Sequence, residues 1–146
     1  MTREEIPVSR LIDMIHHSGI RPSAQRIAVL SYVANTDTHP SADAVYEAVT
    51  LMYPGMSRTT VYNSLHVLVD AGLVKELDVE CSIRRYELAP QPRHSHFACR
   101  KCGRIIDMSM PVHVDRHGFV GFEVDSVEVV YRGLCPGCCK QTDDIK

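Results

Sequence analysis

Two Cys-x₂-Cys pairs constrain this chain more than any other feature of its sequence. Cys99 and Cys102 form the first pair, and Cys135 and Cys138 form the second. Two thiolates at this spacing can hold one zinc ion from a tight turn, so each pair supplies half of a tetrahedral site. The 32 residues between the pairs exceed the roughly 15–20 of a zinc ribbon. We therefore expect a structural Zn²⁺ that ties the start of a small folded unit to its end, with Cys139 as an alternative to Cys138.

The composition indicates a globular chain rather than a disordered or membrane-spanning one. Of the 146 residues, 45% are hydrophobic and 23% are charged, which is typical of one ordinary domain or two small ones. The sequence has no apolar run long enough for a transmembrane helix, and its acidic N-terminus lacks the pattern of a signal peptide. Six cysteines, four of them in metal-binding spacing, fit a reducing compartment. We expect a cytoplasmic protein with no membrane partner.

Residues 1–90 are predicted to form a winged helix-turn-helix. Apolar residues recur there with a helical period in four stretches, and Ser41 and Ser57 are the expected N-caps of the third and fourth helices. Two strand-like runs follow and read as a hairpin. The helix just before such a hairpin is the one that enters the major groove of DNA. The predicted helices are Val8–Ser18, 21–37, 41–53 and Arg58–Ala71, and the predicted strands are Leu73–Leu77 and Arg84–Leu88.

Residues 94–146 are predicted to form a second, smaller α/β domain, which makes the fold class α+β. Residues 89–93 contain two prolines and form the expected linker, because proline favours an extended path. A short sheet with little core leaves open edges, and pairing with a second copy would cover them, so a homodimer is expected. The predicted strands are His94–Ala98, Arg104–Met108 and Val124–Tyr131, with a short helix at Pro111–Phe119.

The fourth helix carries the residues predicted to contact DNA. Its first turn offers hydroxyl and backbone N–H groups to phosphate, and its longer side chains can reach base edges. An ordinary surface helix is the competing interpretation, but this face has no acid before Asp70. Residues 1–90 hold eight Lys and Arg against eleven Asp and Glu, so binding must depend on local arrangement rather than net charge. The predicted contacts are Ser57, Arg58, Thr59, Thr60, Tyr62 and Asn63.

His94 and His96 form a second candidate metal site. Side chains alternate along a strand with a period of two, so both imidazoles fall on one face and can converge on one ion. A solvated strand face is the competing interpretation of an isolated His-x-His pair.

Four stretches of the sequence together resemble the ferric uptake regulator (Fur) family of bacterial metal-dependent repressors. They are HPSADAVY at 39–46, TVYNSL at 60–65, GLV at 72–74 and HSHFACRKCGRIID at 94–107. The resemblance implies a winged-helix DNA-binding domain, a dimerisation domain and a structural zinc on the two cysteine pairs. It also implies a homodimer on palindromic double-stranded DNA and a regulatory metal. Carried over position by position, the regulatory ligands fall on His39, Glu87, His94, His96 and Asp107.

Three imidazoles and two carboxylates suit Fe²⁺ or Mn²⁺, and also other divalent transition metals. Within the family the chain most resembles the peroxide-responsive repressor (PerR) branch, with iron-responsive regulators close behind. Iron-responsive members often carry ligands of a third site where this chain has Arg93 and Ser95. Peroxide sensors typically have two aspartates among the regulatory ligands, whereas this chain pairs Glu87 with Asp107. Zinc-responsive members usually use a cysteine, and Cys81 lies too far upstream to match, so it is read as a loop cysteine.

The predicted function is a metal-dependent transcriptional repressor that senses peroxide through bound Fe²⁺ or Mn²⁺. In such a sensor, His39 and His94 are the imidazoles expected to be oxidised. The alternative is an iron- or manganese-responsive regulator of metal uptake without peroxide sensing. A hydrolase built on the three histidines is not expected, because no general base stands out beyond the metal carboxylates. A thiol switch at Cys99 and Cys102 is the remaining rival.

Overall fold

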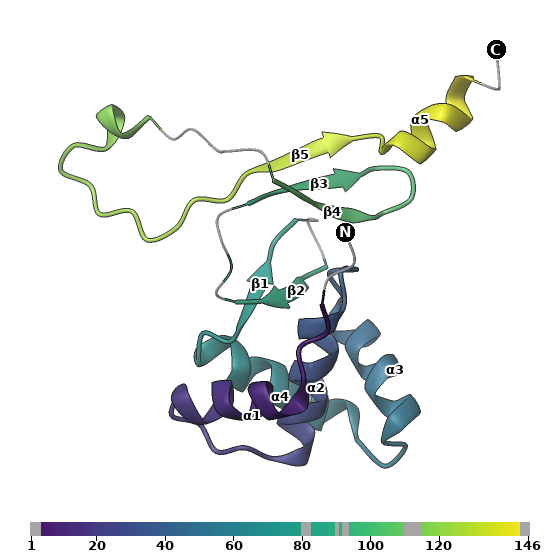
Figure 1. Cartoon of the computed structure of the whole chain (residues 1–146). Helices are drawn as coiled ribbons and strands as arrows, with labels where there is room; N and C mark the ends of the chain where they lie inside the picture. The colour runs from purple at the N-terminus through teal and green to yellow at the C-terminus, as the bar shows by residue number, and fades with distance from the viewer. Residues whose placement is uncertain (1–3, 80–82, 90, 92–93, 110–114, 144–146) are drawn as a thin grey trace. The chain divides into compact units, whose positions relative to one another are not determined.

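Residues 4–79, 83–89, 91, 94–109 and 115–143 are described by the computed structural model of the chain, apart from the side chains of residues 116 and 141–143. They belong to two units, Met1–Pro90 and Gln91–Lys146, and Figure 1 shows the elements of each. Among the described residues, no helix is long and apolar enough to cross a membrane.

Serine side chains begin three of the four helices in the first unit. The hydroxyls of Ser23, Ser41 and Ser57 each accept a hydrogen bond from the backbone N–H three residues on, at 3.1–3.2 Å. This bond satisfies one of the N–H groups that a helix start leaves without a partner. The four predicted helices are confirmed as α1 (Val8–His17), α2 (Ala24–Asn35), α3 (Ala42–Met52) and α4 (Arg58–Asp70).

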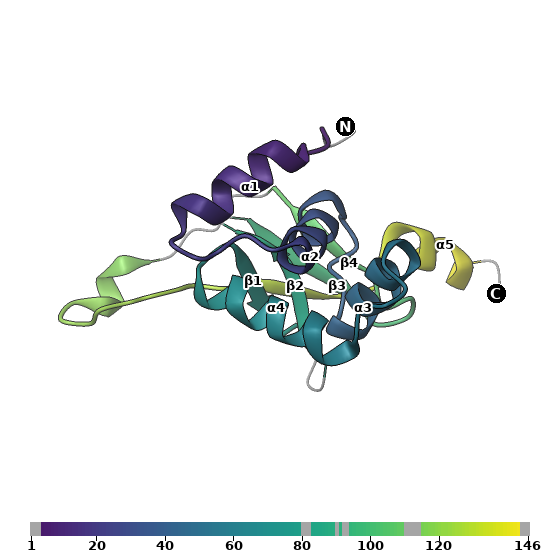
Figure 2. The ribbon, with the colours of Figure 1, turned by 90° about the horizontal axis from the view of Figure 1, so that it is seen from below.

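The core of the first unit lies where the apolar stripes of the helices meet. Figure 2 shows α2 in the middle, with α1, α3 and α4 around it. Side chains of all four helices are less than 4% exposed in this core, because each stripe repeats with the helical period and faces the others. The helical members are Leu11, Ile15, Val29, Leu30, Val33, Ala34, Val45, Val49, Val61, Leu65 and Leu68.

Gly72 ends α4 and turns the chain into the predicted hairpin. It lies at φ +76°, a conformation in which a side chain is strained and glycine is not. The hairpin consists of β1 (Val74–Leu77) and β2 (Arg85–Leu88), which pair antiparallel with Val74 opposite Leu88. The predicted order of a fourth helix followed by a two-stranded hairpin is therefore confirmed.

The second unit is built on a three-stranded sheet of order β4-β3-β5. The strands β3 (Ser95–Cys99) and β4 (Ile105–Met108) pair antiparallel, as expected from the sequence. The third strand, β5 (Val130–Gly133), lies parallel to β3 on its other side. A 3₁₀ turn, η1 (Arg116–Phe119), precedes β5, and the helix α5 (Pro136–Asp143) follows it.

Two predictions for the second unit were wrong. The third strand was expected at Val124–Tyr131, but residues 122–129 form no strand and β5 begins only at Val130. The alternation of Val127, Val129 and Tyr131 with polar residues fits a sheet face, but the ladder with β3 begins only at Val130, which lies opposite His96.

The second cysteine pair was expected in a tight turn, but Pro136, Gly137 and Cys138 lie in the first turn of α5. Proline is well suited to this first helical position, because its missing N–H would have had no partner there. The helix expected at Pro111–Phe119 appears only as η1, and residues 111–114 lie outside the described part. Cys81 and Arg93 also lie outside it.

Candidate metal centres and nucleic-acid interface

The pairing of β3 with its two neighbours assembles four thiols. Cys99 ends β3, and the β3–β4 turn, with Gly103 at φ +73°, carries Cys102 back over it. The parallel register of β5 sets Gly133 opposite Cys99, so that Cys135 arrives two residues later beside the same thiol. All four sulfurs, including that of Cys138, lie within 4.8 Å of one another.

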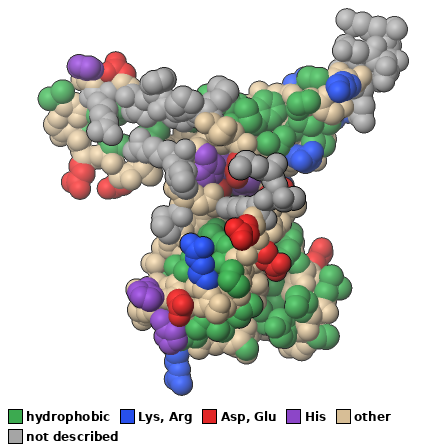
Figure 3. Space-filling view, viewed as in Figure 1, with side chains coloured by type: hydrophobic (Ala, Val, Ile, Leu, Met, Phe, Trp, Pro, Cys, Tyr) green, Lys and Arg blue, Asp and Glu red, His purple; other side chains and the backbone are tan. Residues whose placement is uncertain are grey.

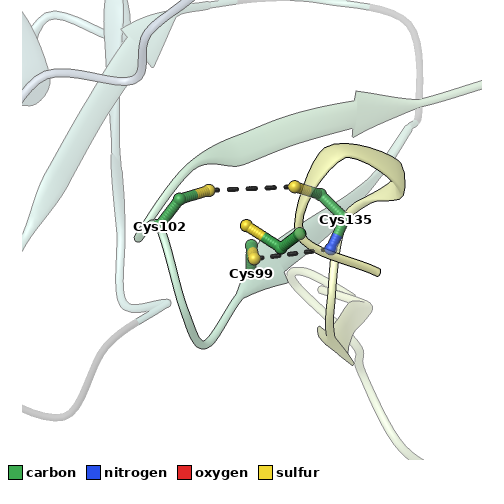
Figure 4. A group of neighbouring side chains, drawn as sticks. Cys99, Cys102 and Cys135 are labelled. Atoms are coloured by element: carbon green, nitrogen blue, oxygen red, sulfur yellow. Dashed lines mark hydrogen bonds between the residues drawn. The ribbon is translucent and has the colours of Figure 1, made fainter. Parts of the chain in front are cut away.

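The distances within this thiol cluster fit a tetrahedral zinc ion. Sulfurs about 2.3 Å from one zinc at tetrahedral angles stand about 3.8 Å apart, and the sulfurs of Cys102 and Cys135 are 3.8 Å apart. Figure 4 shows these two facing each other, with the backbone N–H of Cys135 donating to the Cys99 sulfur at 3.4 Å. A disulfide would need about 2.0 Å. The group is therefore a set of free thiols around a zinc-sized centre.

The protonation of the thiol cluster also favours a cation. Hydrogen bonds from the backbone N–H groups of Cys102 and Cys135 lower the pKa of Cys99 to about 5. The hydrogen bond with Cys135 and burial instead raise the pKa of Cys138 to about 12. Four neighbouring thiolates repel one another unless a metal ion supplies positive charge. Cys139 is exposed and its thiol donates to the Leu134 carbonyl at 3.6 Å, so among the described residues it is Cys138 that joins the cluster.

In the first unit, His39 and Glu87 form a buried pair. The Tyr86 N–H donates to the Pro40 carbonyl at 3.0 Å, and Ser41 forms a bridge with Arg85, so the residues before α3 run alongside β2. This places His39 Nε2 3.5 Å from Glu87 Oε2, with both residues at most 6% exposed.

The backbone at His39 is itself unusual. Its φ is +49°, the one left-handed conformation of a non-glycine residue in the described chain. Such a conformation costs on the order of 1–3 kcal/mol and is often found at functional sites. The chain therefore maintains this local strain while it holds the imidazole beside Glu87.

In the second unit, the β3–β4 register gathers two imidazoles and a carboxylate. His96 lies directly opposite Asp107 across the strand pair, and His94 precedes it by two residues, on the same face. The His94 and His96 Nε2 atoms are 3.1 Å apart, and they lie 3.5 and 3.3 Å from Asp107 Oδ1. Ligand atoms about 2.1 Å from one ion stand about 3.0 Å apart at right angles and about 3.4 Å apart at tetrahedral angles. The three side chains therefore fit neighbouring positions around one metal ion.

The predicted DNA contacts lie on the outer face of α4 and at its start. Arg58, Thr59, Tyr62 and Asn63 are exposed. The Ser57 hydroxyl accepts from the Thr60 N–H and lies 2.8 Å from the Thr60 hydroxyl, so these two side chains are engaged in capping the helix.

Two arginines beside this face were not among the predicted contacts. Arg21, two residues before the N-cap Ser23 of α2, and Arg26, in the first turn of α2, line a hollow together with residues 60 and 63 of α4. The Arg26 guanidinium donates to the Arg21 carbonyl at 2.6 Å. The two arginines lie on either side of the N-cap Ser23 in the sequence. Their closeness to α4 depends on how α2 and α4 pack, which the sequence does not reveal.

The contact of α4 with Asp43 of α3 was also not predicted from the sequence. The Asp43 carboxylate accepts a hydrogen bond from the Tyr62 hydroxyl at 2.6 Å and pairs with the Arg58 guanidinium. Figure 3 shows basic side chains scattered among acidic ones on the visible face of the first unit, rather than gathered into one patch. Residues 1–90 also hold fewer Lys and Arg than Asp and Glu, so DNA binding by this unit would depend on individual contacts rather than on net charge.

Comparison with known proteins identifies a family and several relatives that this chain resembles over most of its length. Residues 17–132 match the model of the ferric uptake regulator family. The peroxide operon regulator of Bacillus subtilis (strain 168) is 34% identical over 134 residues, covering 89% of this chain and 92% of that protein. The transcriptional regulator FurA of Mycobacterium tuberculosis (strain H37Rv) is 35% identical over 130 residues, covering 86% and 88%. The solved structure of the Helicobacter pylori ferric uptake regulator, described as having three functional metal binding sites, aligns with a TM-score of 0.73 at 26% identity, covering 94% of this chain and 97% of that one.

Proposed function

The chain belongs to the ferric uptake regulator family, and we propose that it is a DNA-binding repressor whose bound Fe²⁺ or Mn²⁺ senses peroxide. The observation that carries the proposal is the convergence of His94, His96 and Asp107 on one face of β3 and β4. These ligands, without thiolate, suit Fe²⁺ and Mn²⁺. The cysteine cluster holds the structural Zn²⁺ through Cys99, Cys102, Cys135 and Cys138.

The regulatory ion also recruits the buried pair of the first unit. His39 and Glu87 supply one more imidazole and one more carboxylate, which completes a set of five ligands. Because the two groups belong to different units, an ion bound to both fixes one unit against the other. Metal loading then selects the arrangement in which two recognition helices match the two halves of a palindrome. A coupling of about 1–3 kcal/mol suffices for this and changes DNA affinity about 5–150-fold.

The DNA contacts of the proposal are those on α4, with two added arginines. Arg58, Thr59, Tyr62 and Asn63 face outward from the helix that precedes the wing. The capped helix start at Ser57 and Thr60 directs backbone N–H groups toward phosphate. Arg21 and Arg26 lie at the edge of the same face and add positive charge.

The proposed molecule is a homodimer formed by the second unit. β5 occupies one edge of the three-stranded sheet, and Val120, Phe122, Val124 and Val127 are exposed in the residues before it. A second copy would cover these apolar side chains and the strand edge. Light scattering of the zinc-loaded chain at micromolar concentration is expected to give the mass of two copies, and a monomer would contradict this part of the proposal.

Peroxide sensing is the finer part of the proposal, supported by the B. subtilis relative that is named a peroxide operon regulator. The second candidate is an iron- or manganese-responsive regulator without peroxide sensing, because other relatives are named transcriptional regulator FurA. Bound Fe²⁺ would supply the electrons that reduce hydrogen peroxide close to the ligand imidazoles. The side chain of His94 is 17% exposed and that of His39 only 4%, so His94 is the more accessible of the two histidines proposed to be oxidised.

A binding experiment tests the metal dependence. Because the operator is unknown, a random duplex library is enriched on the full chain loaded with Zn²⁺ and Mn²⁺, and the enriched duplex becomes the probe. Affinity for this duplex is expected to rise about 5–150-fold with Mn²⁺, and His96→Ala is expected to abolish the rise. His117→Ala is the matched control, because His117 also pairs with an aspartate of the second unit but is not one of the predicted regulatory ligands. Equal affinities with and without Mn²⁺ would refute the proposal.

A second experiment separates the two candidates. The chain is loaded anaerobically with Fe²⁺, exposed to hydrogen peroxide and analysed by peptide mass spectrometry. A sensor gains one oxygen atom on the peptide that contains His94 or His39 only when both Fe²⁺ and peroxide are present. Unmodified histidines together with metal-dependent DNA binding would favour the regulator without peroxide sensing.

A further inference from the structure

One carboxylate holds both long side chains of the recognition face. Asp43 lies in the first turn of α3, while Arg58 and Tyr62 lie four residues apart on one face of α4. The same oxygen, Asp43 Oδ1, receives the Tyr62 hydroxyl at 2.6 Å and pairs with Arg58 Nη1. The Arg58 guanidinium also stacks 4.5 Å from the ring centroid of Tyr46. Both DNA-facing side chains are thus fixed by α3, although all three members of the group are exposed.

The contact with Asp43 determines what Tyr62 can offer to DNA. A tyrosine hydroxyl has one proton to donate, and here Asp43 receives it. The hydrogen bond to Asp43 is also the main cause that raises the pKa of Tyr62 above its ordinary value, at which the phenol is already protonated at neutral pH. Toward DNA, the Tyr62 hydroxyl oxygen can then only accept a hydrogen bond. Phosphate oxygens also only accept, whereas the exocyclic amines of adenine and cytosine donate in the major groove.

The same contact changes what Arg58 contributes. Its positive charge is matched by the negative charge of Asp43, and its planar group is held over Tyr46. An exposed ion pair of this kind adds little to folding stability. Its effect lies in orientation and in charge, because a neutralised arginine displaces no counterion from a phosphate.

The geometry points to Asp43 as a positioning residue that makes Tyr62 an acceptor for a base amine and keeps Arg58 from acting as a phosphate-neutralising cation. The inference rests on the proposed DNA-binding function and deepens it, since it states which chemical group on the base Tyr62 reads. Asp43 itself need not touch DNA.

Three substitutions separate the two effects in the full-length, Zn²⁺- and Mn²⁺-loaded chain. Asp43→Asn removes the charge and keeps an oxygen acceptor, whereas Asp43→Ala removes both. Tyr62→Phe removes the hydroxyl and keeps the Asp43–Arg58 pair. Asp70→Asn is the charge-matched control, because Asp70 lies at the end of α4 and pairs with His66 rather than with Arg58 or Tyr62. Zinc content and helicity are checked for each variant.

Each protein enriches duplexes from the same random library, and its affinity for the wild-type duplex is measured across salt concentrations. Tyr62→Phe and Asp43→Ala are expected to lose at least about five-fold preference at one and the same base pair of each half-site. That base pair carries adenine or cytosine opposite Tyr62, and the enriched sequences show which. Asp43→Asn is expected to keep this preference and to steepen the salt dependence by about 0.9 per recognition helix.

Loss of preference at different base pairs, or an unchanged salt dependence in Asp43→Asn, would overturn the inference. An equal change in salt dependence for Asp70→Asn and Asp43→Asn would also overturn the inference, because the change would then follow from net charge alone. Failure of the wild-type chain to enrich any duplex would overturn the proposed function as well. If the wild-type chain binds DNA in a metal-dependent way but Asp43→Ala keeps the wild-type base preference and salt dependence, only the role of Asp43 is overturned.

Discussion

Removing the zinc is expected to unfold the second unit and to leave the first unit folded. The second unit has a small described core, in which Phe97, Ile106 and Leu134 pack against the buried cysteines. Fully burying three such side chains would contribute at most about 9 kcal/mol. A structural zinc contributes about 10–16 kcal/mol in small zinc domains. Metal binding therefore stabilises the second unit more than its apolar core does, whereas the first unit has fourteen buried residues in its own core.

The measurement is hydrogen–deuterium exchange of the full chain before and after a strong zinc chelator. Peptides that cover β3, β4 and α5 are expected to lose protection, while those from α2 and α4 keep it. Two adjacent cysteines supply a matched pair of variants. Cys138→Ser is expected to reproduce the effect of chelation and to lower the zinc content, because Cys138 belongs to the thiol cluster. Cys139→Ser is expected to change neither.

Continued protection of β3 in a chain shown to be free of zinc would refute this reasoning. It would mean that strand pairing and the small core suffice to order the unit. Equal effects of the two serine variants would instead refute the choice of Cys138 as the fourth ligand.

Three further outcomes follow from single contacts. Ser41→Ala removes the N-cap of α3 and is expected to lower the free energy of unfolding by about 1 kcal/mol, measured with denaturant. Leu65→Ala leaves a cavity in the core of the first unit and is expected to cost about 2–5 kcal/mol in the same assay. In an ultraviolet pH titration, Asp43→Ala is expected to lower the pKa of Tyr62 toward 10.0, because the hydrogen bond that favours the protonated phenol is lost. Stability from that bond is present below the unfolded pKa of about 10 and is lost as the pH rises through the higher folded value. A Tyr62 titration unaffected by the loss of Asp43 would contradict the last outcome.

Local signals allowed the helices and the hairpin to be predicted. The serine caps and Gly72 act within a few residues of their own position, so the sequence states them directly. The His-x-His face and its closeness to Asp107 followed from strand period and a short hairpin. The nearness of the two cysteine pairs was also expected, because a shared metal requires it.

Features that depend on distant partners could not be predicted. β5 begins where its pairing with β3 begins, at Val130 opposite His96, and the alternation around Val127 does not reveal this register. The bridge of Ser41 with β2, which brings His39 to Glu87, joins residues more than forty positions apart. In the sequence, Asp43 is simply an acidic residue in the first turn of a helix. Only the packing of α3 on α4 shows that its carboxylate accepts a hydrogen bond from Tyr62.

The parallel alignment of β5 with β3 has a consequence for how the protein matures. Parallel neighbours require a long connection, here the 36 positions from Cys99 to Cys135, and closing such a connection is slow. During synthesis the ribosome releases the helices and the hairpin first, and they can pack before Cys135 emerges. A newly made chain therefore passes through a stage in which α4 is complete and the thiol cluster is not. A zinc ion that binds at that stage has only Cys99 and Cys102 of the four thiols available.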